Sequence, residues 1–143
     1  HVYVADYYGY HAEGFDVTFP ITQTPYKKLN HDNKLKIYNI IDEKLLDKYK
    51  NKFDIVVLYD ILEHLETVQQ VETAITLMKQ CTKKYMLFSI PFIGDPNLNN
   101  DETHHIKKTQ QWWEWKIRSF GITIITTPNT FLYKHQIIIG TIS

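Results

Sequence analysis

FDIVVLYDILEHL, Phe53 to Leu65, is the stretch that decides the fold class of this chain. Its first seven residues, Phe53–Tyr59, are mostly apolar and rich in β-branched side chains, which is typical of a strand covered on both faces. Asp60 closes the run, and an amphipathic segment follows. An acidic residue in this place marks the carboxyl end of the strand, where open α/β sheets bind ligands. The alternative is a core strand whose Asp60 only caps the next helix.

The segments on either side of this stretch alternate between expected strands and expected helices. Thr67–Lys79 carries apolar residues at three- and four-residue spacing, which predicts a helix that begins near Leu62. Alternation predicts a parallel sheet wrapped by helices, and two strands close together at the end predict an antiparallel C-terminal strand. We therefore expect one α/β domain over residues 1–143. The other expected strands are Val2–Ala5, Phe15–Ile21, Leu35–Ile41, Tyr85–Ile90, Ile122–Thr127 and Tyr133–Thr141, and the other helices are Glu43–Lys50 and Thr109–Ser119.

Composition limits the compartments and partners to be expected. The chain has 16 basic and 16 acidic residues and a formal net charge of zero, so charge does not indicate a nucleic-acid partner. Apolar runs stay far below the roughly 20 residues of a membrane span, so no membrane partner is expected. Cys81 is the single cysteine, which excludes a disulfide framework and favours a reducing, cytoplasmic location. Because the chain begins at His1 rather than Met, one interpretation is a domain that lacks some N-terminal residues.

Two stretches resemble a known family. Phe-Asp-Ile-Val-Val followed by Asp-Ile-Leu-Glu-His-Leu is similar to the fourth-strand motif of class I S-adenosylmethionine-dependent methyltransferases, in the branch with a Leu-Glu-His signature. Ser89–Ile122 resembles the segment after the fifth strand of that branch, with its acidic loop, His pair and Trp-bearing helix. The resemblance covers about Leu35 to Ile139. It implies a Rossmann-like methyltransferase sandwich with a mostly parallel sheet, an antiparallel C-terminal strand and S-adenosylmethionine as cofactor.

The resemblance also implies cofactor-binding residues. The third strand of the family ends in an acid that accepts a hydrogen bond from the adenine amino group, and Asp42 is in the matching place. Ile41 is expected to lie against the adenine ring. Tyr59 and Asp60, at the end of the fourth strand, are expected beside the methionine part of the cofactor. The alternative for Asp42 is the N-cap of the following helix.

The N-terminal part departs from the family pattern. The first strand should be followed by acid-x-Gly-x-Gly, and Val2–Tyr10 offers only Asp6 and Gly9 for these positions. The second strand should end in an acid for the ribose hydroxyls, and Val17–Thr22 has none. Three explanations stay open: missing residues, a shortened enzyme that binds the cofactor by other groups, or a fold that has lost the cofactor.

Histidines are the candidate catalytic residues. His64 follows the expected strand end, and a histidine can act as a general base near neutral pH. The resemblance implies a second, substrate-facing histidine at the pair His104 and His105. Neighbouring side chains point in different directions, so only one can face inward, and we expect this to be His105. The alternative for His64 is a structural role, as a helix cap or a partner of a backbone group.

A metal site is not predicted from the spacing of the possible ligands. Imidazole and carboxylate groups are plentiful in this part of the chain. However, no pair has the close helical spacing of a motif such as His-Glu-x-x-His. The residues considered are His64, Asp95, Asp101, Glu102, His104 and His105.

The function expected from these features is methyl transfer from S-adenosylmethionine to an oxygen or nitrogen of an acceptor. The acceptor is unknown, and a small molecule or a glycan is favoured because the net charge is zero. The alternative is a degenerate methyltransferase fold that serves as a non-catalytic binding or scaffold module, since fold does not imply function.

Overall fold

A computed structural model of the chain describes residues 1–17, 32, 34–95, 98–99, 101–127 and 136–142. The chain divides into two compact units, His1–Asp42 and Glu43–Ser143, and each is described by itself. The single domain expected for residues 1–143 therefore stays a prediction. Among the described helices, none has the length and apolar character needed to cross a membrane.

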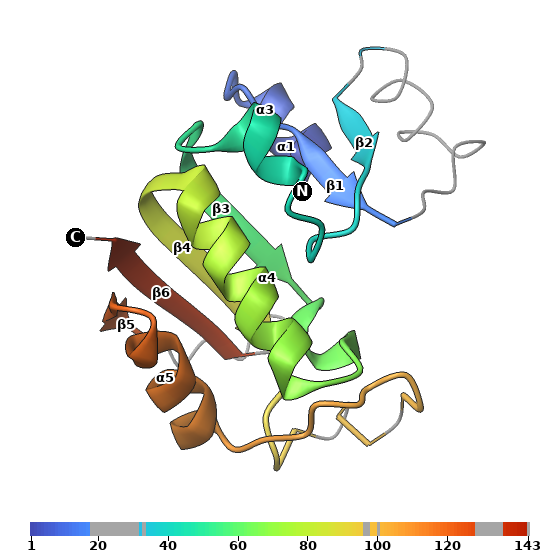
Figure 1. The fold of residues 1–143 in the computed structure, drawn as a ribbon, viewed down its shortest axis with the longest axis vertical. Coiled ribbons are helices and arrows are strands. Elements are labelled where there is room, and N and C mark those ends of the chain that lie inside the picture. The colour runs from blue at the N-terminus through green and yellow to red at the C-terminus, as the bar shows by residue number, and fades with distance from the viewer. Residues whose placement is uncertain (18–31, 33, 96–97, 100, 128–135, 143) are drawn as a thin grey trace. The chain divides into compact units, whose positions relative to one another are not determined.

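The first unit contains a short helix and two short strands (Figure 1). These are α1 (Val2–Tyr7), β1 (Gly14–Asp16) and β2 (Leu35–Ile37). The two strands pair in parallel, with Gly14 opposite Leu35 and Asp16 opposite Ile37. Residues 18–21, the rest of the expected second strand, lie outside the described residues.

Two predictions for the first unit are wrong. The expected strand Val2–Ala5 is helical, and the amide of Ala5 donates to the His1 carbonyl at 2.9 Å. A run of four apolar residues is too short for its periodicity to separate a helix from a strand. β2 ends at Ile37 rather than Ile41, because the chain turns there and the Asp42 amide donates to the Asn39 carbonyl at 3.0 Å.

The second unit is built on a four-stranded sheet in the order β3-β4-β6-β5. β3 and β4 pair in parallel, whereas β6 is antiparallel to both of its neighbours. Three strands therefore run one way and β6 runs the other way, which confirms the expected mostly parallel sheet with an antiparallel C-terminal strand. The strands are β3 (Phe53–Tyr59), β4 (Thr82–Ile90), β5 (Ile122–Thr126) and β6 (Gln136–Ile142).

Three helices accompany this sheet. α4 (Val68–Cys81) lies along β3 and β4, α5 (Gln110–Ser119) packs on β5, and the short α3 (Leu45–Tyr49) packs on α4 (Figure 1). The core lies between α4 and the sheet, where apolar residues of α4 meet buried residues of β4. Its fully buried members include Val71, Ala74 and Ile75 on α4 and Met86, Phe88 and Ile90 on β4.

One expectation for β3 is wrong. β3 was expected to be covered on both faces, but Ile55 and Val57 are 56% and 48% exposed, whereas Leu58 is buried. The apolar run marked the strand correctly, but it does not tell how many of its faces are covered. For the site it matters that β3 is parallel to β4, because both strands then end at the same edge of the sheet.

Candidate functional site

The candidate site begins at the turn that leaves β3. Asp60 has φ of 50°, in the left-handed region that few non-glycine residues adopt. Ser89, near the end of β4, stabilises this turn through its backbone and its side chain. Its carbonyl accepts from the Asp60 amide at 3.0 Å, and its hydroxyl donates to Asp60 Oδ1 at 2.9 Å. The chain can therefore turn sharply away from the sheet and start a short 3-10 helix, η1 (Leu62–His64), at the edge where β3 and β4 end.

Glu63 is the least expected residue of this turn, because its side chain is fully buried. Neither carboxylate oxygen accepts a hydrogen bond from another described residue. Burial raises the pKa of Glu63 to about 8; its own backbone amide partly opposes this, and the nearby charges of Asp60 and Asp101 add to it. A buried carboxyl group without partners is costly, so this position is chemically unusual.

The backbone of Glu63 fixes the loop that follows β4. Its carbonyl accepts from the amides of His105 and Ile106, at 2.8 Å and 3.0 Å. Side chains alternate along this segment, so that His104 and Ile106 are buried and His105 is exposed. The expectation that His105 faces inward is therefore wrong, and His104 takes that place. The sequence contained a sign of this arrangement. In an extended segment, alternate side chains point the same way, so His104 lies on the same side as the apolar Ile106.

A chain of hydrogen bonds orients His64. The Thr103 hydroxyl donates to Asp101 Oδ1 at 2.5 Å, and Nδ1 of His64 lies 2.8 Å from the same hydroxyl oxygen. Because the hydroxyl hydrogen is used for Asp101, the oxygen accepts from Nδ1–H of His64. This leaves Nε2 of His64 as the nitrogen that can accept a proton. The hydrogen bonds from the Thr103 hydroxyl and amide, helped by His104 and His64, lower the pKa of Asp101.

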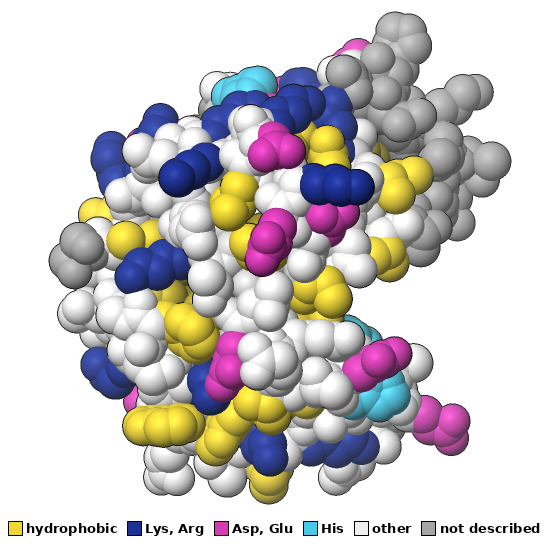
Figure 2. All heavy atoms as spheres, in the orientation of Figure 1, with side chains coloured by type: hydrophobic (Ala, Val, Ile, Leu, Met, Phe, Trp, Pro, Cys, Tyr) yellow, Lys and Arg dark blue, Asp and Glu magenta, His cyan; other side chains and the backbone are white. Residues whose placement is uncertain are grey.

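His104 lies beside His64 in this cluster. The two ring centroids are 4.6 Å apart with an interplanar angle of 66°. Nδ1 of His104 is 3.1 Å from the Leu98 carbonyl oxygen, and its Nε2 is 3.8 Å from Asp101 Oδ2. On the surface of the second unit, histidine and acidic side chains lie next to one another (Figure 2). The ligand set Glu63, His64 and His104 could hold a metal ion, which the sequence spacing did not predict because its members come from two separate segments.

The predicted cofactor residues fall into both units. Tyr59 ends β3 in the second unit and Asp60 follows it, and both are half-buried. Ile41 and Asp42 follow β2 in the first unit, where Ile41 is half-buried and Asp42 is exposed in the turn. Tyr59, Asp60 and His64 thus lie in one unit, and their roles stay predictions.

Asp6 and Gly9 do not form the expected loop after a strand. Asp6 lies in α1 and forms an ion pair with Lys34, and Gly9 follows this helix with φ of 80°. A better acid was missed: Asp16 ends β1 and accepts from the Val17 amide at 2.7 Å. The resemblance places a ribose-binding acid at the end of the second strand. The ribose-binding acid was sought in Val17–Thr22, whereas β1 ends at Asp16.

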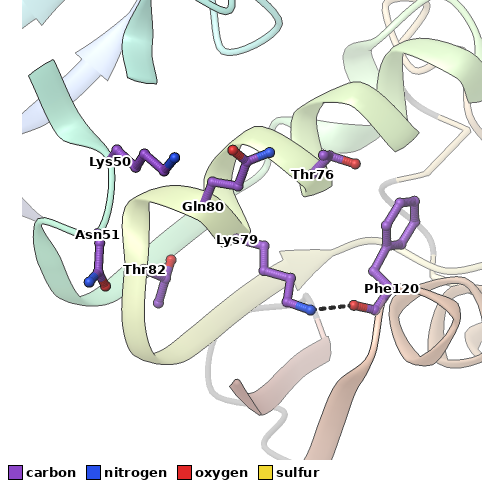
Figure 3. A pocket seen from close by; sticks show the side chains of 7 residues that line it. All are labelled: Lys50, Asn51, Thr76, Lys79, Gln80, Thr82 and Phe120. Atoms are coloured by element: carbon purple, nitrogen blue, oxygen red, sulfur yellow. Dashed lines mark hydrogen bonds between the residues drawn. The ribbon is translucent and has the colours of Figure 1, made fainter. Parts of the chain in front are cut away.

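A pocket lies at the other end of the second unit (Figure 3). It is formed by the last turns of α4 and the start of β4, at the amino end of the strand, where α/β folds do not usually bind ligands. Lys79 reaches across it and donates to the Phe120 carbonyl at 2.7 Å. This pocket is therefore separate from the turn after β3. Its lining residues are Lys50, Asn51, Thr76, Lys79, Gln80, Thr82 and Phe120.

Comparison with known proteins supports the fold. No protein-family model and no curated protein sequence matches the chain. Among solved structures, the PH0226 protein from Pyrococcus horikoshii OT3 has a TM-score of 0.75 at 11% identity, over 99% of this chain and 76% of that chain. A SAM-dependent methyltransferase from Archaeoglobus fulgidus has a TM-score of 0.70 at 12% identity, over 98% and 80%. An O-methyltransferase family protein from Burkholderia thailandensis has a TM-score of 0.69 at 14% identity, over 98% and 46%, so the chain spans less than half of it.

These likenesses confirm the expected architecture. The chain has the Rossmann-like fold of class I methyltransferases, and the resemblance read from Phe53–Leu65 and Ser89–Ile122 is confirmed at the level of the fold.

Proposed function

We propose that this chain, which has a methyltransferase fold, transfers the methyl group of S-adenosylmethionine to an oxygen or nitrogen atom of an acceptor. One observation carries the proposal: the turn Asp60–His64 gathers an acid and a histidine at the carboxyl end of β3, the edge where open α/β sheets bind ligands. The solved structure from Archaeoglobus fulgidus, with the same fold, is a SAM-dependent enzyme. A single cysteine favours a reducing, cytoplasmic compartment.

The proposed cofactor contacts use acids at strand ends. Asp42 would accept a hydrogen bond from the adenine amino group, with Ile41 against the ring, and Asp16 would accept from the ribose hydroxyls. Asp16 ends β1, and Asp42 follows the turn after the parallel strand β2, which fits these roles. Tyr59 and Asp60 would lie beside the methionine part.

The proposed chemistry leaves little covalent work to the protein. S-adenosylmethionine, when bound, supplies a sulfonium methyl group that a nucleophile can displace. The protein positions the acceptor in line with that methyl group. Nε2 of His64 takes the proton that the acceptor loses, and Thr103 and Asp101 keep the imidazole in the tautomer that can do so. The exposed His105 is the second candidate for the residue that takes this proton.

The acceptor is proposed to be a small molecule or a glycan. The formal net charge of zero does not favour the phosphate backbone of a nucleic acid.

The alternative is a non-catalytic binding module, and it also has support. Between Asp6 and the start of β1, Gly9 is the only glycine, and Asp6 forms an ion pair with Lys34. The glycine-rich loop that approaches the cofactor in the family has no counterpart there.

Titration calorimetry of the folded protein with S-adenosylmethionine and S-adenosylhomocysteine separates the two functions. We expect binding, weakened about tenfold or more by Asp42→Asn and by Asp16→Asn, because a hydrogen bond to a charged group contributes ~1.5–3 kcal/mol. Asp54→Asn is the control, since Asp54 is exposed near the start of β3. Absence of binding to either ligand would contradict methyl transfer and favour the binding module.

A further inference from the structure

We propose that Glu63, His64 and His104 form a binding site for a divalent transition-metal ion of the zinc type. The site goes beyond the proposed methyl transfer, and its occupancy can be measured without any methyl donor.

The geometry brings the three donor groups together from two segments. Glu63 and His64 lie on η1, and His104 lies on the loop that the Glu63 carbonyl holds in place. One donor atom from each residue lies within 4.8 Å of the others. A tetrahedral ion with ligand distances of about 2.0–2.2 Å holds its donor atoms roughly 3.5 Å apart. Small side-chain rotations are therefore enough to close the cluster around an ion.

The buried carboxyl of Glu63 points independently to a cation. The side chain is fully buried, and its two oxygens accept no hydrogen bond from another described residue. Buried charges in proteins are paired or coordinate metals. A cation bound by Glu63 removes this cost.

Both histidines are oriented as metal ligands commonly are. Nδ1–H of His104 donates to the Leu98 carbonyl, since a carbonyl oxygen can only accept. Nδ1–H of His64 donates to the Thr103 hydroxyl, which in turn donates to Asp101. Each ring therefore presents the lone pair of Nε2. Metal-binding histidines nearly always donate their other N–H to a carbonyl, carboxylate or water, which fixes the ring and its tautomer.

The type of donor selects the type of ion. Two imidazoles and one carboxylate suit zinc and related first-row metals, whereas Mg²⁺ and Ca²⁺ prefer sites made of oxygen ligands. Three protein ligands leave a coordination position open, as in sites where a metal binds water or a substrate. Nε2 of His64 would bind the ion in this arrangement, so the proposed role of His64 as proton acceptor belongs to the ion-free protein.

Calorimetric titration of the whole chain with Zn²⁺, with Mg²⁺ as the comparison, tests the site. We expect one Zn²⁺ per chain and at least 100-fold weaker binding of Mg²⁺. Glu63→Gln and His104→Ala should each weaken Zn²⁺ binding at least 100-fold, and Thr103→Ala about 10- to 100-fold, as expected for the loss of a group that orients a ligand. His105→Ala is the matched control, because it removes the exposed neighbouring imidazole and should leave Zn²⁺ affinity unchanged.

The outcomes separate a built site from surface histidines. Absence of Zn²⁺ binding, or equal loss in His105→Ala and His104→Ala, overturns the proposal. His104 is buried, so that variant alone could fail through misfolding. Glu63→Gln covers this case, because it keeps the shape of the side chain and its oxygens accept no hydrogen bond from a described neighbour. A Glu63→Gln protein that melts like the parent and still binds Zn²⁺ fully would also overturn it. If Zn²⁺ binds but S-adenosylmethionine does not, only the proposed methyl transfer fails.

Discussion

At the scale of single residues, the backbone conformation of Asp60 determines where the chain leaves β3 and η1 begins. Its positive φ turns the chain away from the sheet, and Ser89 on the neighbouring strand holds that turn with two hydrogen bonds. Residues in sparsely populated conformations are common at functional sites, because surrounding structure has to maintain them. The position of Glu63 and His64 thus depends on a contact between the ends of β3 and β4.

A substitution at Asp60 tests this strain. Asp60→Val should lower the free energy of unfolding by about 1–3 kcal/mol relative to Asp60→Asn. Val is a real outlier at positive φ and removes the acceptor of the Ser89 hydroxyl, whereas Asn tolerates the conformation and keeps an oxygen acceptor. Urea denaturation of the two variants measures the difference. The control is the pair Asp54→Val and Asp54→Asn on β3, where Val suits the extended backbone. Equal stability of the two Asp60 variants would contradict the conformation described.

Thr103 makes a second test at a single residue. Its hydroxyl and amide hydrogen bonds stabilise the charged form of Asp101 and lower its pKa. Thr103→Ala removes the hydroxyl donor, so the pKa of Asp101 should rise toward the ordinary aspartate value, and carboxyl carbon NMR titration of chelator-treated protein measures it. Ser at the same position keeps a hydroxyl, so Thr103→Ser should keep most of the depression. An unchanged pKa in Thr103→Ala would show that the Thr103 hydroxyl does not hold this carboxylate.

Among the helices and strands, the elements of the second unit were predicted well. β3 was predicted at Phe53–Tyr59 and found there, since its apolar run is long and ends at a clear acid. The helix predicted at Thr67–Lys79 is α4, but it does not begin near Leu62. η1 and an extended Leu65 come first, and Thr67 then caps a new helix. Periodicity found the helix, while the break depended on the turn at Asp60, a tertiary contact that the sequence does not display.

The site was only partly predictable for the same reason. His64 and Asp60 follow the strand in sequence and could be identified from it. The burial of Glu63 and the inward position of His104 depend on two backbone hydrogen bonds between η1 and a distant loop. In the first unit, short elements such as α1 carry too little periodicity, and this misled the assignment of the N-terminal strand and of Asp16.

The cap of α4 offers a test at the level of an element. The Thr67 hydroxyl accepts from the Gln70 amide at 3.2 Å, so Thr67→Ala should lower the free energy of unfolding by ~1 kcal/mol. Chemical denaturation measures the change. Thr73→Ala is the matched control, because Thr73 lies inside the helix, its hydroxyl donates to the Gln69 carbonyl, and Ala is the better helix former. A larger loss in Thr73→Ala than in Thr67→Ala would contradict this start of the helix.

For the molecule as a whole, the fold and the proposed chemistry rest on different grounds. Solved structures with 11–14% identity establish the architecture, whereas the proposed function depends on polar groups of each unit. Those groups are Asp60, Glu63, His64 and His104 in the second unit, and Asp16 and Asp42 in the first. The central claim is that S-adenosylmethionine binds at these strand ends rather than elsewhere.

The most direct test is an amide NMR titration of the isotope-labelled chain with S-adenosylhomocysteine. We predict shifts that concentrate at Asp60–His64, at the end of β1 near Asp16, and at Asp42 in the turn after β2. The pocket beside Lys79 at the amino end of β4 should remain unshifted. Shifts confined to that pocket, or no shifts at saturating ligand, would contradict the claim that this fold binds its cofactor at the carboxyl ends of its strands.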